Sequence, residues 1–145
     1  HTTGLRYFTV YGPWGRPDMA YFIFTQKILS GEPISVFNNG NMKRDFTFID
    51  DIISGTKAAI NRNYELEIFN LGNQKSEMLL DIIKTIENEL NKKALIKFKP
   101  MQPGDVKETY ADINKTKKML SFNPKTSINE GLPEFIHWYK KYYNI

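Results

Sequence analysis

Arginine and aspartate residues stand in three short polar segments that interrupt apolar stretches of this 145-residue chain. The segments are 9–18 (TVYGPWGRPD), 43–46 (KRDF) and 102–105 (QPGD). The forked guanidinium group of arginine, here Arg16 and Arg44, suits paired contacts with phosphate or carboxylate. A carboxylate that follows Pro-Gly, here Asp105, can accept hydrogen bonds from sugar hydroxyls. Together these residue types predict a sugar phosphate as the ligand.

Simpler structural roles compete with this interpretation. Arg44 and Asp45 are neighbours that could form a surface ion pair, and the residues alone favour neither role. Segment 102–105 could be a plain turn, which its spacing alone favours over function. Arg16 could stabilise its own loop by pairing with Asp18. The loop around Arg16 nevertheless contains two glycines and two prolines, and loops stiffened in this way often hold functional side chains.

Length and composition predict one globular domain and exclude several classes, and the pattern of strands and helices makes that domain α/β. No apolar run approaches the roughly 20 residues that span a bilayer, so we expect no membrane segment and a soluble, cytoplasmic protein. The chain has no cysteine, and His1 and His137 lack the spacing of a ligand pair, so no metal site is expected. The formal charge is +4. Its lysines fall on predicted helix faces and turns without interleaved aromatic residues, which argues against nucleic-acid binding.

Hydrophobic patterning predicts short strands and peripheral helices. The expected strands are 5–10, 34–37, 46–49, 68–71 and 94–98. The expected helices begin at residues suited to cap an N-terminus, namely Asp18, Asp50 or Asp51, Ser76, Asp112 and Ser127. Gly31 ends the first helix, the second runs through Ile60, and the fourth runs through Leu120.

Two of these helices have further sequence signals. The helix after Ser76 has one apolar stripe, which predicts burial in the core: Leu79, Ile82, Ile83, Ile86 and Leu90. Ser127 and Glu130 match a capping box for the last helix. Pro133 favours a start at Asn129 or later, because proline is tolerated only in the first turn.

In this order, the three polar segments resemble the C-terminal part of NAD-dependent nucleotide-sugar epimerases and dehydratases, the extended short-chain dehydrogenase/reductase family. Segments 7–20 (YFTVYGPWGRPDMA) and 42–51 (MKRDFTFIDD) look most like its UDP-glucuronate 4-epimerase branch. Segments 101–106 (MQPGDV) and 109–112 (TYAD) fit the same branch. The resemblance covers nearly the whole chain. It implies that residues 1–145 form the small substrate-binding domain of a Rossmann-type epimerase, with 1–12 belonging to the sheet of the dinucleotide-binding domain.

The resemblance assigns roles to residues near the first segment. Phe8 and Val10 would lie against the nicotinamide of NAD. Thr9, which stands where many relatives have asparagine, would touch the sugar. Asp18 and Met19 would meet the nucleotide sugar largely through their backbone at a helix N-terminus.

The remaining assignments concern the nucleotide. Ser35 and Phe37 would frame the uracil by main-chain hydrogen bonds and an aromatic contact. Arg44 would hold the diphosphate, and Asp105 would bind the ribose hydroxyls. Gln102 stands where galactose-type epimerases have a second phosphate-binding arginine, so this chain departs from that pattern.

Arg16 receives the most specific prediction. Its guanidinium is expected to pair with the C5 carboxylate of glucuronate, with Thr9 hydrogen-bonding nearby. A neutral hexose offers no charge there, so this pairing would discriminate between UDP-glucuronate and UDP-glucose.

Two motifs of the family do not occur in the chain. No tyrosine has lysine four residues later, and no Gly-x-Gly-x-x-Gly turn is present. The chain also begins at His1, which is compatible with a tag remnant. We therefore expect a piece of a longer NAD-dependent enzyme that holds substrate determinants but no catalytic residue.

The expected function is to bind UDP-glucuronate within an enzyme that interconverts UDP-glucuronate and UDP-galacturonate, as for polysaccharide precursors. The alternatives are a fragment of a UDP-glucuronate decarboxylase, a fragment of a sugar-nucleotide dehydratase, or a non-catalytic UDP-sugar-binding module. The oligomeric state, a homo-oligomer included, is left open.

Overall fold

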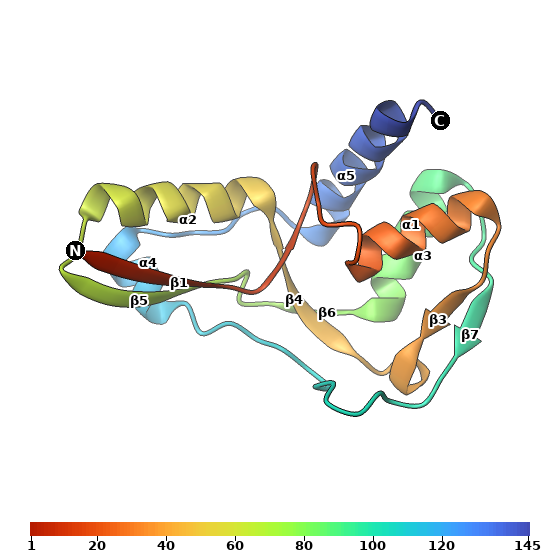
Figure 1. The fold of residues 1–145 in the computed structure, drawn as a ribbon, viewed down its shortest axis with the longest axis horizontal. Coiled ribbons are helices and arrows are strands. Elements are labelled where there is room, and N and C mark those ends of the chain that lie inside the picture. The colour runs from red at the N-terminus through yellow and green to blue at the C-terminus, as the bar shows by residue number, and fades with distance from the viewer.

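The computed structural model describes all residues from 1 to 145. Its elements, drawn in Figure 1, are β1 (Thr2–Tyr7), β2 (Thr9–Tyr11), α1 (Ala20–Ser30), β3 (Ile34–Val36), a 3-10 turn (Phe37–Gly40), β4 (Lys43–Phe48), α2 (Ile49–Arg62), β5 (Leu66–Leu71), β6 (Ser76–Met78), α3 (Leu79–Leu90), β7 (Ile96–Phe98), α4 (Asn114–Leu120) and α5 (Ile128–Tyr143). The predicted α/β class with short strands is confirmed. None of the helices combines the length and apolar character that crossing a membrane requires.

The strands form three small sheets. β1 pairs with β5 and β3 pairs with β7, both in parallel. β4 pairs in parallel with β2 and antiparallel with β6. In Figure 1, β1, β5, α2 and α4 lie at one end of an elongated molecule, whereas α1, α3, β3 and β7 lie at the other. The long strand β4 leads from the second group toward the first.

Each end has its own hydrophobic cluster. The larger cluster has 18 buried residues, contributed mainly by α1, α3, α5 and the strands beside them. It includes the predicted stripe of α3, of which Leu79 is only partly buried. The smaller cluster has 8 buried residues, drawn from α2, α4, β5 and nearby segments.

The predicted strand 5–10 is in fact two strands. β1 follows β5 as far as Tyr7, and the N–H of Phe8 still donates to the Leu71 carbonyl at 3.1 Å. The next residues leave that sheet and pair with β4 as β2. The prediction of one strand was wrong because the apolar run continues through the point where the chain changes partners.

Four predicted N-caps are also wrong. The capping positions of α1, α2, α3 and α4 are Met19, Phe48, Met78 and Ile113, and none makes a side-chain capping bond. Strands β4 and β6 run directly into α2 and α3, so the last extended residue occupies the cap. Asp51 instead accepts hydrogen bonds from the N–H groups of Lys125 and Thr126, at 3.1 and 2.9 Å. Ser76 donates to the Thr109 carbonyl at 2.7 Å.

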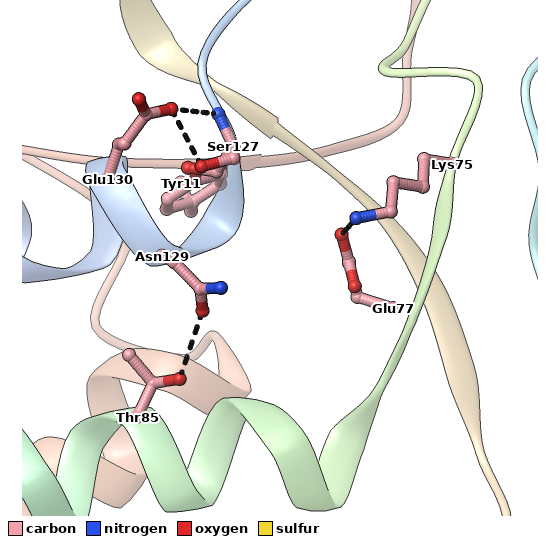
Figure 2. Close-up of polar contacts among 7 residues, drawn as sticks. All are labelled: Tyr11, Lys75, Glu77, Thr85, Ser127, Asn129 and Glu130. Carbon is pink, nitrogen blue, oxygen red and sulfur yellow. Dashed lines mark hydrogen bonds and ion pairs between the residues drawn. The ribbon is translucent and has the colours of Figure 1, made fainter.

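The last two helices agree better with the sequence. α4 ends at Leu120 as predicted, and Asp112 accepts a hydrogen bond from the Asn114 N–H at 3.0 Å. The capping box of α5 is confirmed: the Glu130 carboxylate accepts bonds from the N–H and hydroxyl of Ser127, at 2.9 and 2.7 Å (Figure 2). The suggested start at Asn129 or later was wrong, because α5 begins at Ile128 and includes Pro133 in its interior. The helix tolerates this proline while its apolar side is buried.

Candidate functional site

A cavity of about 540 Å³ brings together residues from distant parts of the sequence. It lies among β2, α1, β3, β4, the start of α3 and the segment after β7. Eight of the predicted site residues line it: Thr9, Asp18, Met19, Ser35, Phe37, Arg44, Gln102 and Asp105. We call it the first cavity.

Two structural features place these side chains. α1 presents one face to the first cavity, formed by residues at helical spacing: Ala20, Ile23, Phe24 and Lys27. The parallel pairing of β3 with β7 then brings segment 102–105 to the same space. That segment is a turn, with the Asp105 N–H donating to the Gln102 carbonyl at 3.2 Å. The turn and the binding interpretations of this segment are therefore compatible.

Arg44 has no carboxylate partner. Its Nη1 donates to the carbonyls of Lys43 and Lys107, at 2.8 and 3.4 Å, and it takes part in none of the four ion pairs of the structure. The suspected pairing with Asp45 does not occur. A half-buried guanidinium on the wall of a cavity, with its charge uncompensated, is suited to bind an anion.

Asp45 has a different role. It is fully buried, and its carboxylate accepts hydrogen bonds from the N–H groups of Asn73, Gln74 and Ala111, at 2.7, 3.0 and 3.0 Å. The Thr47 hydroxyl also donates to it at 3.2 Å. Asp45 therefore connects β4 to two loops, and it is the next residue after Arg44, which lines the first cavity.

A second cavity of about 380 Å³ adjoins the first, because Met19 lines both. It contains the three other predicted site residues: Phe8, Val10 and Arg16. Thr9 faces the first cavity while its two neighbours face the second, as alternation along extended backbone requires.

The loop that contains Arg16 is held tightly, as its glycines and prolines predicted. Gly12 has φ of 134°, and a Cβ there would lie 2.6 Å from Cγ2 of Ile49. A Cβ on Gly15 would collide with the buried Tyr21 hydroxyl. Trp14 has a left-handed backbone with φ of 63°. Its ring packs on α5, with centroids 5.4 Å from Trp138 and 5.3 Å from Tyr142. Sequence reasoning missed this contact with α5, because it joins segments far apart in the chain.

Arg16 and Asp18 form an ion pair on the surface. Nε donates to Oδ1 at 3.0 Å and Nη2 donates to Oδ2 at 2.6 Å. The side chains are 73% and 66% exposed. The hydrogen bond from Arg16 lowers the pKa of Asp18 and raises that of Arg16. The loop-stabilising role considered for Arg16 is thus present, although Nη1 makes no hydrogen bond to the protein.

The N-terminal residues of α1 were predicted to meet the ligand through their backbone, and one of their N–H groups is used within the protein. The N–H of Met19 donates to the Arg16 carbonyl at 3.2 Å. The first open N–H of the helix is that of Ala20, which also lines the first cavity.

Another polar cluster, shown in Figure 2, has a structural explanation. The Thr85 hydroxyl of α3 donates to Asn129 of α5 at 3.5 Å, and Lys75 pairs with Glu77 at 2.7 Å. The first contact joins α3 to α5, and the second is an ion pair within the segment that contains β6. No group of three or more His, Cys, Asp or Glu side chains could hold a metal ion.

Comparison with known proteins gives a consistent family. Residues 1–72 match the family model described as the NAD dependent epimerase/dehydratase family. The UDP-glucuronate 4-epimerase of Thermodesulfobacterium geofontis is 45% identical over 138 residues, covering 94% of this chain and 42% of that protein. UDP-glucuronate 4-epimerase 4 of Arabidopsis thaliana is 44% identical over 161 residues, covering 98% of this chain and 36% of that protein. The chain spans less than half the length of these relatives.

A solved structure agrees with the sequences. The UDP-glucuronic acid 4-epimerase from Bacillus cereus, in complex with UDP-glucuronic acid and NAD, superposes with a TM-score of 0.89. It is 40% identical, and the match covers 96% of this chain and 45% of that one. On these matches, residues 1–72 belong to the NAD dependent epimerase/dehydratase family, and nearly the whole chain is similar to part of proteins named UDP-glucuronate 4-epimerase.

Proposed function

We propose that residues 1–145 are the nucleotide-sugar-binding part of an NAD-dependent UDP-glucuronate 4-epimerase, which interconverts UDP-glucuronate and UDP-galacturonate. The observation that supports this best is the gathering of eight predicted nucleotide-sugar contacts around one cavity. The relatives named UDP-glucuronate 4-epimerase, at 44 and 45% identity, support the same assignment.

The first cavity suits the nucleotide part of such a substrate. Arg44 supplies an unpaired cation for the diphosphate, and Asp105 supplies acceptors for the ribose hydroxyls. Phe37 offers an aromatic ring beside Ser35, where the base would lie.

The second cavity suits one side of a nicotinamide. Phe8 and Val10 form an apolar wall there, next to the sugar-facing Thr9. NAD, when bound, would accept a hydride from the sugar C4 and return it. Residues 1–145 contain no glycine-rich phosphate-binding turn, so they would supply this wall and leave the phosphate contacts and the catalytic base to residues outside them.

The sheet of β1 and β5 also supports the proposal that residues outside 1–145 complete the NAD site. Both strands are parallel and have no further strand beside them. Leu66 and Ile68 are 75% and 50% exposed on β5, whereas parallel sheets are normally covered on both faces. We propose that β1 and β5 continue the sheet of a dinucleotide-binding domain, whereas residues 9–11 of the predicted range 1–12 pair with β4 instead.

Arg16 is proposed to bind the C5 carboxylate of glucuronate. Arg16 lines the second cavity, Arg44 lines the first, and Met19 lines both, so a sugar between the two cavities could reach Arg16. Nη1 is open to a second carboxylate while Asp18 holds Nε and Nη2. Once C4 is a ketone, the substrate is a β-keto acid, and a carboxylate held in the ring plane would resist loss of carbon dioxide.

Arg44→Ala in the complete gene product that contains residues 1–145 tests the nucleotide site. We expect affinity for both UDP and UDP-glucuronate to fall by roughly 1.5–3 kcal/mol, measured by calorimetry, because every diphosphate ligand loses a charge-assisted contact. Lys57→Met, an exposed charge on α2 away from both cavities, is the control. Unchanged UDP affinity in Arg44→Ala would refute the diphosphate assignment.

Arg16→Ala tests the carboxylate site. We expect weaker binding of UDP-glucuronate, with UDP and UDP-glucose nearly unchanged, and some UDP-pentose among the products. An equal loss for all three ligands, or none, would contradict the assignment. A UDP-pentose as the main product of the wild-type enzyme would favour a decarboxylase instead.

A further inference from the structure

Lys27 has no role in the function proposed above, although it lines the first cavity. It lies in the last turn of α1 and is half-buried. Ala20, at the other end of the same helix face, marks the start of α1. At a rise of about 1.5 Å per residue, Lys27 is roughly 10 Å along the axis from Ala20. It therefore lies away from the Asp18 end of the cavity and toward β3.

The adjacent strand offers backbone groups to a ligand at this end. The N–H of Ile34 donates to Leu95 at 2.8 Å, and the carbonyl of Val36 accepts from Lys99 at 2.9 Å, so both residues use the β7 side. Backbone groups alternate between the two edges of a strand, and β3 has no strand on its other edge. The N–H and carbonyl of Ser35 are therefore on the open edge, at a residue that lines the cavity.

These groups match one base. The pairing edge of uracil presents acceptor, donor and acceptor in the order O2, N3–H and O4. Ser35 has one acceptor for N3–H and one donor for a flanking carbonyl, which leaves the other carbonyl unbound. An ammonium group is a donor only. Cytosine presents an amino donor at position 4 and an unprotonated N3, so it mismatches both Ser35 and a lysine.

We infer that Lys27 is a specificity-determining residue, which donates a hydrogen bond to a uracil carbonyl and so selects uridine over cytidine nucleotides. The inference rests on the proposed nucleotide site. Lys27 is available for this contact because its ammonium takes part in no ion pair or hydrogen bond. Two other roles of Lys27 predict different affinities. If Lys27 bound the diphosphate, its loss would weaken the binding of UDP and CDP equally. If it only stabilised the C-terminal end of α1, its loss would weaken the binding of neither nucleotide.

The test compares Lys27→Met with the wild-type complete gene product, using UDP and CDP as the probes in calorimetry. Methionine keeps the length of the aliphatic chain and removes the charge and the donors. Wild type is expected to prefer UDP over CDP by at least about tenfold. In Lys27→Met, UDP affinity is expected to fall about tenfold, or about 1.4 kcal/mol, while CDP changes less than about twofold.

Lys27→Gln keeps a donor on a shorter side chain and should retain part of the preference, which also covers any failure of Lys27→Met to fold. Lys57→Met is the matched control. Equal losses for UDP and CDP, no loss for either, or equal binding of both nucleotides by wild type would each overturn the inference. If wild type does not bind UDP at all, the proposed function itself is wrong.

Discussion

Asp45 is the residue whose loss should disturb the site most without touching a ligand. Its carboxylate is completely buried and accepts three backbone hydrogen bonds from two loops. In Asp45→Asn, one oxygen becomes an amide that faces N–H donors, so buried donors lose their acceptor. We expect the free energy of unfolding to fall by roughly 2–4 kcal/mol, measured by urea denaturation.

Asp50→Asn is the matched control for this prediction, because Asp50 is exposed in the first turn of α2. It should cost less than about 1 kcal/mol. A loss in Asp45→Asn no larger than in the control would show that the connection of β4 to the two loops adds nothing to stability.

The residue types in the sequence predicted which residues form the site better than they predicted what those residues contact. The arginines and aspartates were recognised because their chemistry is specific, and Arg44 indeed lines the first cavity without a carboxylate partner. The sequence could not decide between Asp18 and a ligand for Arg16, since both are anions within reach. Lys27 was missed because a lysine near a helix end is usually solvated, and only the closeness of α1 to β3 gives it another role.

At the scale of elements, helix interiors were easier to predict than helix starts. The apolar stripe of α3 fixes its buried face through a 3.6-residue period. Ser76 and Asp51 looked like caps, but their side chains bind backbone groups of distant segments. Only the capping box of α5 was predicted correctly, because Ser127 and Glu130 satisfy each other locally and need no tertiary partner.

The α5 capping box makes stability depend on pH. Hydrogen bonds from the Ser127 hydroxyl and N–H lower the pKa of Glu130 below its ordinary value of 4.5. The stabilisation is therefore present above about pH 4.5 and is lost as pH falls through the lowered pKa. Glu130→Gln should be less stable than wild type at pH 7, and the difference in thermal unfolding should shrink below pH 4.

Glu134→Gln is the control for this titration, since Glu134 is exposed one turn later in α5 and makes no capping bond. A difference between wild type and Glu130→Gln that stays constant from pH 7 to pH 3 would exclude the ionised carboxylate as its cause.

At the scale of the whole molecule, the first cavity is built on one hydrophobic cluster only. Its walls come mainly from α1, β3, β4 and the start of α3, whose buried residues belong to the larger cluster. The smaller cluster, formed with α2, α4 and β5, contributes none of the lining residues. This division was not visible in the sequence, because segments of the two clusters alternate along the chain.

The division predicts where a nucleotide will stabilise the protein. A ligand that binds only the folded site raises the free energy of the openings that would destroy that site. We expect saturating UDP to slow amide hydrogen exchange in α1, β3 and α3, with α2, α4 and β5 nearly unchanged, as measured by mass spectrometry of peptides. In Arg44→Ala the same UDP concentration should protect α1 much less. Equal protection at both ends of the molecule would mean that the two clusters open as one unit, so that binding at the cavity reaches the sheet of β1 and β5 as well.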